Sequence, residues 1–200
     1  MAGYAGDVVS GTPPLHDPRH PGALPAVLAS HDIAITIALS ILALALFAGV
    51  IWTDRPLTEA GYSMVNLQLA GTATMAGQIL DTWRAAGVID AAALNQRADY
   101  VFMLVYPPAL SMTCHTLGAR LPVPSGTWLC RAVLLCAPLD ATENLAIQHM
   151  LDQGAGPLAS CVAAACALPK FMLAGAALTW CALGLVRLSR SEARTCTRRE

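Results

Sequence analysis

The feature that most limits how this chain can fold is an uncharged apolar run of 20 residues, Ile33 to Trp52. At 1.5 Å per residue, a helix of that length crosses the roughly 30 Å hydrocarbon core of a bilayer. The composition agrees, because 56% of the 200 residues are hydrophobic, 12% are charged and the mean hydropathy is +0.53. Soluble domains carry about 25% charged residues. We therefore predict an all-α integral membrane protein.

Apolar runs predict four transmembrane helices, near residues 33–52, 99–117, 130–150 and 158–186. They lie in a predicted membrane domain of residues 32–187. Residues 1–31 are proline-rich and predict a flexible leader, and residues 188–200 predict a basic cytoplasmic tail. The first run exceeds the apolar stretch of a signal peptide, which is about 7–15 residues, so an uncleaved first span is favoured over a cleaved one.

Between the first two spans, residues 65–85 predict an amphipathic helix on the outer face of the membrane or over the end of the bundle. Its apolar residues recur at intervals of three and four: Leu69, Ala73, Ala76, Leu80 and Trp83. A fifth span is the alternative, but it would bury Asp81 and Arg84.

The arginines are distributed unevenly about these spans, eight on one side against three on the other. The larger set is Arg19, Arg120, Arg131, Arg187, Arg190, Arg194, Arg198 and Arg199, and the smaller set is Arg55, Arg84 and Arg97. Because basic loops stay in the cytoplasm, we predict that both termini are cytoplasmic. The tail arginines lie beside a span and indicate topology and lipid headgroup contacts, so we expect no nucleic-acid partner.

Charged residues interrupt the later apolar runs, at a cost of at least ~2.5–3.5 kcal/mol each at membrane depth. Asp140, Glu143 and Asn144 stand at i, i+3 and i+4 on one helix face, and Lys170 lies at a matching depth in the next span. We expect Lys170 to pair with Asp140 or Glu143. The sequence predicts a polar pocket open toward the outer face and lined by Asp99, Tyr106, Asp140, Glu143, Asn144 and Lys170.

Pro107 and Pro108 stand in the middle of the second span. Proline has no backbone N–H, so the pair predicts a kink or an unwound turn, with a free carbonyl near Phe102 or Met103.

The seven cysteines form no CxxC pair of the kind that zinc sites use, and most lie in predicted spans. We interpret them as structural residues. No metal site and no cofactor are predicted.

Several short motifs resemble a widespread group of small four-span bacterial membrane proteins of unknown function. The motifs are LQLAGT at 67–72, ILDTW at 79–83, ADYVFMLVYP at 98–107, LDATEN at 139–144 and the lysine at 170. The resemblance implies that Trp83, Asp99, Tyr106, Asp140, Glu143, Asn144 and Lys170 belong to one recurring design. It also implies the bacterial cytoplasmic membrane as the location, and it adds no known reaction.

Three classes of function remain open. The first is proton relay or the handling of ions or small solutes, in a homo-oligomer or a larger membrane complex. The second is an intramembrane enzyme acting on a lipid or isoprenoid, with Asp140 or Glu143 as the general acid and Lys170 as its partner. The absence of a nucleophile or phosphate-binding motif weighs against it. The third is a structural subunit in which the charges only hold helices together.

Overall fold

The computed structural model describes residues 24–121 and 125–197, and the side chains of residues 31–121 and 128–190. Its elements are helices throughout these ranges, which confirms the all-α prediction. In order they are α1 (Leu24–Glu59), α2 (Met64–Gln68), α3 (Ala73–Ala85), α4 (Ile89–Gly118), α5 (Ser125–Ala132), the 3₁₀ helix η1 (Val133–Leu135), α6 (Cys136–Gln153) and α7 (Pro157–Thr197).

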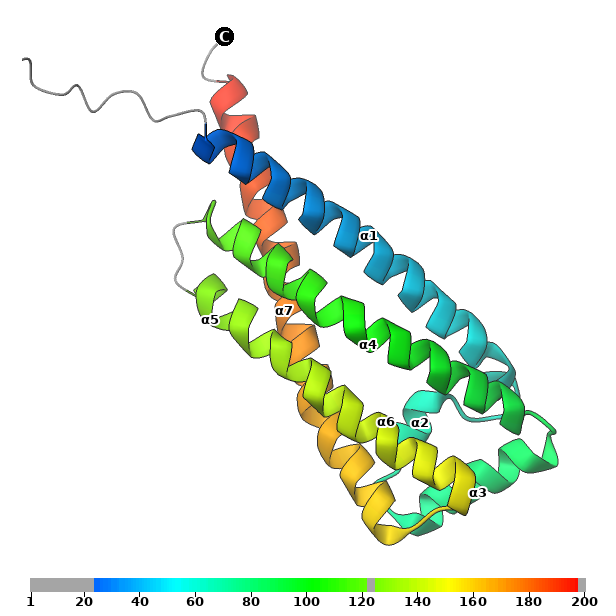
Figure 1. The fold of residues 1–200 in the computed structure, drawn as a ribbon. Helices are drawn as coiled ribbons and strands as arrows, with labels where there is room; N and C mark the ends of the chain where they lie inside the picture. The colour runs from blue at the N-terminus through cyan, green and yellow to red at the C-terminus, as the bar shows by residue number, and fades with distance from the viewer. Residues whose placement is uncertain (1–23, 122–124, 198–200) are drawn as a thin grey trace, which may run out of the picture.

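The long helices α1, α4, α6 and α7 lie side by side in an elongated bundle, in which α5, η1 and α6 follow one another along one rod (Figure 1). Two segments are long and apolar enough to cross a membrane, His31–Glu59 of α1 and Pro157–Arg190 of α7. Most of their apolar side chains face outward; Leu44 on α1 is 68% exposed and Met172 on α7 is 74% exposed. They therefore differ from the core helices of a soluble protein, which are mostly buried.

Several helix boundaries differ from those predicted. Helix α1 begins at Leu24, inside the predicted leader, and α4 begins at Ile89, ten residues before the predicted second span. Helix α7 continues to Thr197, through most of the predicted tail. Apolar periodicity indicates only the part of a helix that is buried or faces lipid. The helix itself continues as far as its backbone hydrogen bonds do, so its ends lie outside the apolar run. The side chains of Arg19, Arg194, Arg198 and Arg199, and residues 1–23 of the leader, lie outside the described part.

Polar contacts join α1 to α4 near both ends of the pair. The hydroxyl oxygens of Thr36 and Thr116 lie 3.2 Å apart, and Asn95 Nδ2 donates to the carbonyl of Val50 at 2.8 Å. Between them, the ring of Phe47 lies 5.6 Å from that of Phe102 on α4. Helix α1 is thus packed against α4, while most of its surface faces outward.

The predicted amphipathic helix is two helices, α2 and α3. The chain turns between them at Gly71, whose φ of +67° is a conformation that favours glycine. Asp54 Oδ1 accepts from the backbone N–H of Met64 at 2.7 Å and so holds the start of α2, and Thr72 caps α3. With 13 residues, α3 is about 20 Å long, too short to cross a bilayer, so the fifth-span alternative is wrong.

Helices α2 and α3 cover one end of the bundle, against α6 and α7 (Figure 1). The indole of Trp83 is fully buried, and its Nε1 donates to the carbonyl of Tyr62 at 2.9 Å. Leu67 of α2 packs in the same apolar cluster as Met150 of α6 and Ala163 of α7. The amphipathic segment therefore caps the bundle with its apolar face buried.

Helix α4 continues through Pro107 and Pro108 as a single α-helix, so the predicted unwound turn is not found. Because the prolines lack N–H groups, the i to i−4 pattern leaves two carbonyls without their helical donors, that of Met103, which is within the expected range, and that of Leu104.

Candidate functional site

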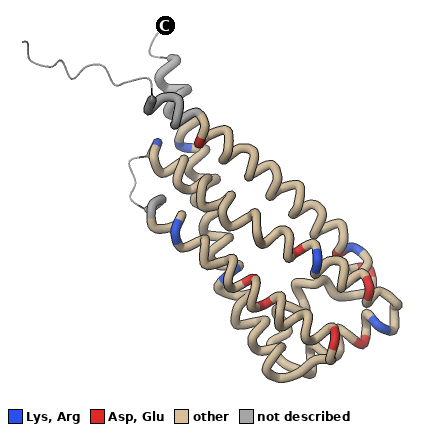
Figure 2. The backbone as a smooth tube through the Cα atoms, in the orientation of Figure 1, with Lys and Arg blue, Asp and Glu red and all other residues tan. Residues whose placement is uncertain are grey.

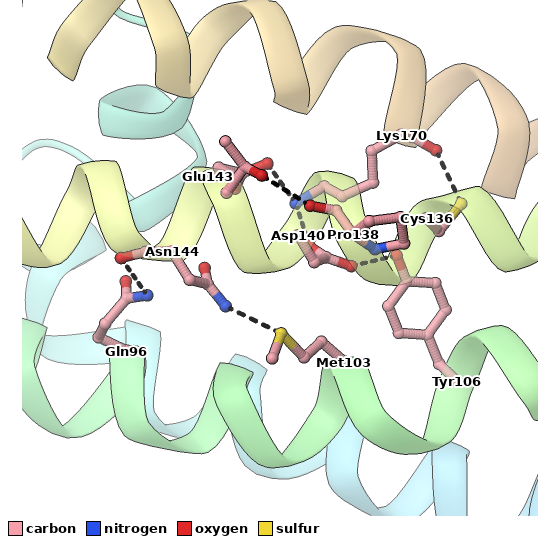
Figure 3. A network of polar contacts seen from close by, with 10 residues as sticks. Gln96, Met103, Tyr106, Cys136, Pro138, Asp140, Glu143, Asn144 and Lys170 are labelled. Carbon is pink, nitrogen blue, oxygen red and sulfur yellow. Dashed lines mark hydrogen bonds and ion pairs between the residues drawn. The ribbon is translucent and has the colours of Figure 1, made fainter.

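A layer of buried charges lies between α4, α6 and α7. Lys170 Nζ is 2.7 Å from Asp140 Oδ1 and 2.7 Å from Glu143 Oε2 (Figure 3). The three side chains are at most 6% exposed. Because the two acids stand three residues apart on α6, both reach the same ammonium on α7. The predicted ion pair is confirmed, and it involves both acids.

Tyr106 joins this layer from α4. Its hydroxyl donates a hydrogen bond to Asp140 Oδ2, so each oxygen of this carboxylate has a donor, one from Lys170 and one from Tyr106 (Figure 3). The ring of Tyr106 stacks on that of Phe102 with centroids 4.6 Å apart, which fixes the direction of the hydroxyl. Asp140 is consequently the best satisfied of the acids.

Asn144 is fully buried beside Glu143 and is held from α4. Its Nδ2 lies 3.7 Å from the sulfur of Met103, and Gln96 Nε2 donates to its backbone carbonyl at 3.5 Å (Figure 3). Gln96, which is 1% exposed, was missed in the sequence because it precedes the predicted second span. Its spacing was nevertheless a usable signal, since residues 96, 99, 103 and 106 follow one face of a helix.

Asp99 is the third acid of the layer and is half-buried. Its carboxylate interacts electrostatically with Lys170 and Asp140 and contacts the side-chain amide of Asn144. Its Oδ2 is buried and has no hydrogen-bond partner among the described residues. The structure thus brings all six predicted site residues into one neighbourhood.

Hydrogen-bond acceptors exceed donors in this interior. Every buried side-chain polar atom that lacks a hydrogen-bond partner in the described part is an oxygen: Gln68 Oε1, Asn95 Oδ1, Asp99 Oδ2, Asn144 Oδ1 and both oxygens of Glu143. Glu143 Oε2 meets Lys170 as an ion pair, so Oε1 is the open oxygen of that carboxylate. Unpaired buried acceptors cost about 1–3 kcal/mol each, and more when charged. The layer is therefore suited to bind a donor or a cation.

The charged layer lies between two apolar clusters. One cluster, around Trp83 and Met150, includes the α2–α3 cap. The other contains Leu117, Val133 and Cys181 near the opposite end of the bundle. The sequence predicted a pocket open toward the outer face; five of the six predicted side chains are buried, and Asp99 is partly exposed. Periodicity showed that the cap had an apolar face but not that the face would close over the site.

The residues suited to bind a ligand here offer oxygen atoms. Among the described residues, no group of three or more histidine, cysteine, aspartate or glutamate side chains is arranged to hold a metal ion. Cys114 and Cys181 are free thiols with sulfurs 3.5 Å apart, in the apolar cluster rather than the charged layer.

No protein-family model, curated protein or solved structure matches the chain. The resemblance to small four-span bacterial proteins therefore stays a prediction.

Proposed function

We propose that this chain is a four-span membrane protein that binds protons reversibly in its charged layer and relays them between Glu143 and Tyr106. The spans are α1, α4, α7 and the rod formed by α5, η1 and α6. The relay works in a homo-oligomer or a larger membrane complex, because apolar clusters lie on both sides of the layer in one chain.

Outward-facing apolar side chains on α1, α4, α6 and α7 support the proposal of four spans. Leu104 of α4 is 70% exposed and Leu145 of α6 is 65% exposed, as are comparable residues of α1 and α7. With 30 residues, α4 is about 45 Å long, more than a bilayer core requires. Helix α6 falls short of the apolarity of a span because it carries Asp140, Glu143 and Asp152, of which the first two are buried. The acid-free part of α4, residues 100–118, is made less apolar by Tyr106, Pro107, Pro108 and His115.

The arginines support an orientation with both termini in the cytoplasm. Helix α1 begins and α7 ends at the same end of the bundle (Figure 1). The arginines that belong to this end among the described side chains are Arg120, Arg131, Arg187 and Arg190, and those at the other end are Arg55, Arg84 and Arg97. Between the ends, Figure 2 shows a long uncharged stretch of α1. By the resemblance, the membrane is the bacterial cytoplasmic membrane.

The excess of acids over bases carries the proposal. Lys170 can balance one carboxylate, and two further negative charges remain on the three acids of the layer. An ion buried without a partner costs several kcal/mol, so the layer gains stability by binding protons. Both oxygens of Asp140 already have donors, so the proton binds at the open oxygens of Glu143 or Asp99. The contacts from Glu143 through Lys170 and Asp140 to Tyr106 then form an unbroken polar chain.

The alternative is that the charges only hold the helices together. The ion pairs that Lys170 of α7 makes with both acids of α6 favour this alternative. A purely structural pair requires one acid for one base, and interhelical polar contacts in membranes contribute only about 0.6 kcal/mol on average. The two acids in excess of such a pair have no role in a purely structural layer.

Proton uptake by the purified full-length protein tests the proposal. After a jump from about pH 8 to about pH 6, exposed carboxylates stay ionised, so an indicator dye reports groups such as the buried layer. We expect the wild type to bind about one proton more than Glu143→Gln. Asp81→Asn is the matched control, because Asp81 is an exposed acid paired with Arg84, and it should bind as many protons as the wild type. Equal uptake by wild type and Glu143→Gln would favour the structural alternative.

A further inference from the structure

We infer that Asp99 is the group through which the charged layer exchanges protons with water on the outer side of the membrane. The inference deepens the proposed function and rests on it, since it assigns a route to the protons that the layer binds. Glu143 holds the proton, and Asp99 determines how fast the proton reaches it.

Asp99 stands at the boundary between the buried layer and the surface. The residue is partly exposed, whereas Asp140 is 2% exposed and Glu143 is fully buried. Its Oδ2 is nevertheless buried and has no hydrogen-bond partner in the described part. Among the three acids of the layer, only Asp99 combines access to the surface with an open oxygen inside.

The position of Asp99 along α4 places it at the outer edge of the hydrocarbon core. In the proposed orientation, α4 runs from its outer end at Ile89 to its cytoplasmic end at Gly118. Residues 100–118 contain no aspartate, glutamate, lysine or arginine, and at 1.5 Å per residue they extend about 28 Å, close to the roughly 30 Å of the core. Arg97, two residues before Asp99, is exposed, as suits a base that reaches the headgroup region. Asp99 therefore lies where α4 meets the outer water.

Electrostatic interactions connect Asp99 to the rest of the layer. Its carboxylate contacts the side-chain amide of Asn144 and interacts with the charges of Lys170 and Asp140. It also interacts electrostatically with Glu143. Since no hydrogen bond of the described residues joins the two acids directly, the proton crosses from Asp99 to Glu143 after a side-chain rotation or through a bridging water.

The groups that interact with Asp99 leave it as the first carboxylate that a proton from outside meets. They are Tyr100 on α4, Asp140 and Glu143 on α6, and Lys170 on α7. The two acids of α6 and the lysine are buried, and a tyrosine hydroxyl is a far weaker acid than a carboxyl group. Residues 33–53 of α1, the helix that packs on α4, have no titratable side chain, and neither has α2. The outer route into the layer therefore leads through Asp99.

Proton uptake after a laser flash that releases protons from a caged acid tests this route in the purified full-length protein, with an indicator dye as the readout. A positioned side chain commonly speeds proton transfer about 100-fold or more. We expect Asp99→Asn to slow the part of the uptake that depends on Glu143 at least about tenfold. The matched control Asp81→Asn, which removes an exposed acid, should leave this rate unchanged.

Rescue by azide separates a proton route from a structural role. Its conjugate acid is small enough to deliver protons where the carboxylate is missing, so azide should restore the rate in Asp99→Asn and leave that of the wild type unchanged. Asp99→Ser, with a smaller side chain, gives the same reading if Asp99→Asn does not fold. An unchanged rate, or a slow rate that azide does not restore, would overturn the role of Asp99. The proposed function would still stand if the uptake depends on Glu143, and would fall if Glu143→Gln takes up as many protons as the wild type.

Thiol labelling tests the side of the membrane. The variant Asp99→Cys should react with a small impermeant methanethiosulfonate added outside sealed cells, with the labelled residue identified by mass spectrometry. Reaction at position 99 from the cytoplasmic side only, or from neither side, would overturn the outer route.

Discussion

Replacement of Lys170 by methionine removes the only base from the described part of the charged layer. At 2.7 Å and an effective dielectric constant of about 20, each contact of the ammonium with an acid carries about 6 kcal/mol of Coulomb attraction. Desolvation of the buried ions offsets much of this. Since the substitution leaves Asp140 and Glu143 buried without a partner, we expect a loss of about 3–5 kcal/mol in the free energy of unfolding.

Reversible unfolding of the full-length protein in mixed micelles measures this loss. Arg84→Met is the matched control. It also breaks an ion pair, that of Arg84 with Asp81 at 3.1 Å, but the two side chains of this pair are 45% and 76% exposed. Exposed pairs contribute about 0–1 kcal/mol. The combination of Lys170→Met with Glu143→Gln should recover part of the stability, since fewer charges remain unpaired. A loss with Lys170→Met no larger than that with Arg84→Met would refute the reasoning.

Three further predictions concern the layer, its cap and the topology. Tyr106→Phe removes one donor to Asp140 and should lower the free energy of unfolding by about 1.5–3 kcal/mol in the same assay. Trp83→Ala opens a cavity in the cap and should cost about 3–5 kcal/mol, with faster hydrogen exchange in α2 and α3. Single thiols at the exposed positions Gln153 and Ser189 should react with an impermeant reagent from opposite sides of the membrane, Gln153 from outside; reaction from the same side would contradict the proposed topology.

Local spacing was sufficient to predict the ion pair of the layer. Asp140 and Glu143 stand on one helix face by their separation alone, and the cost of a charge at membrane depth required a partner for Lys170. The shared face follows from helix geometry, and the need for a partner follows from the energy of a charge in an apolar medium. Neither requires knowledge of the tertiary structure.

A helix over the end of the bundle was one of the predicted positions, but its division into α2 and α3 and the burial of the layer beneath it could not be predicted in the same way. They depend on a turn at Gly71 and on the packing of Trp83 against residues of other helices, which no local pattern specifies. Gln96 was missed for a simpler reason, because α4 begins well before its apolar run and carries polar residues into the bundle.

The most direct test of the charged layer as a proton-binding site is an infrared titration of the full-length protein, read at the carbonyl band of protonated carboxyl groups. We predict a band that grows as the pH is lowered over the range in which the protein stays folded, that is largely lost in Glu143→Gln and that persists in the exposed control Asp81→Asn. A folded protein with no titrating band, or with the same band in Glu143→Gln as in the wild type, would contradict the account.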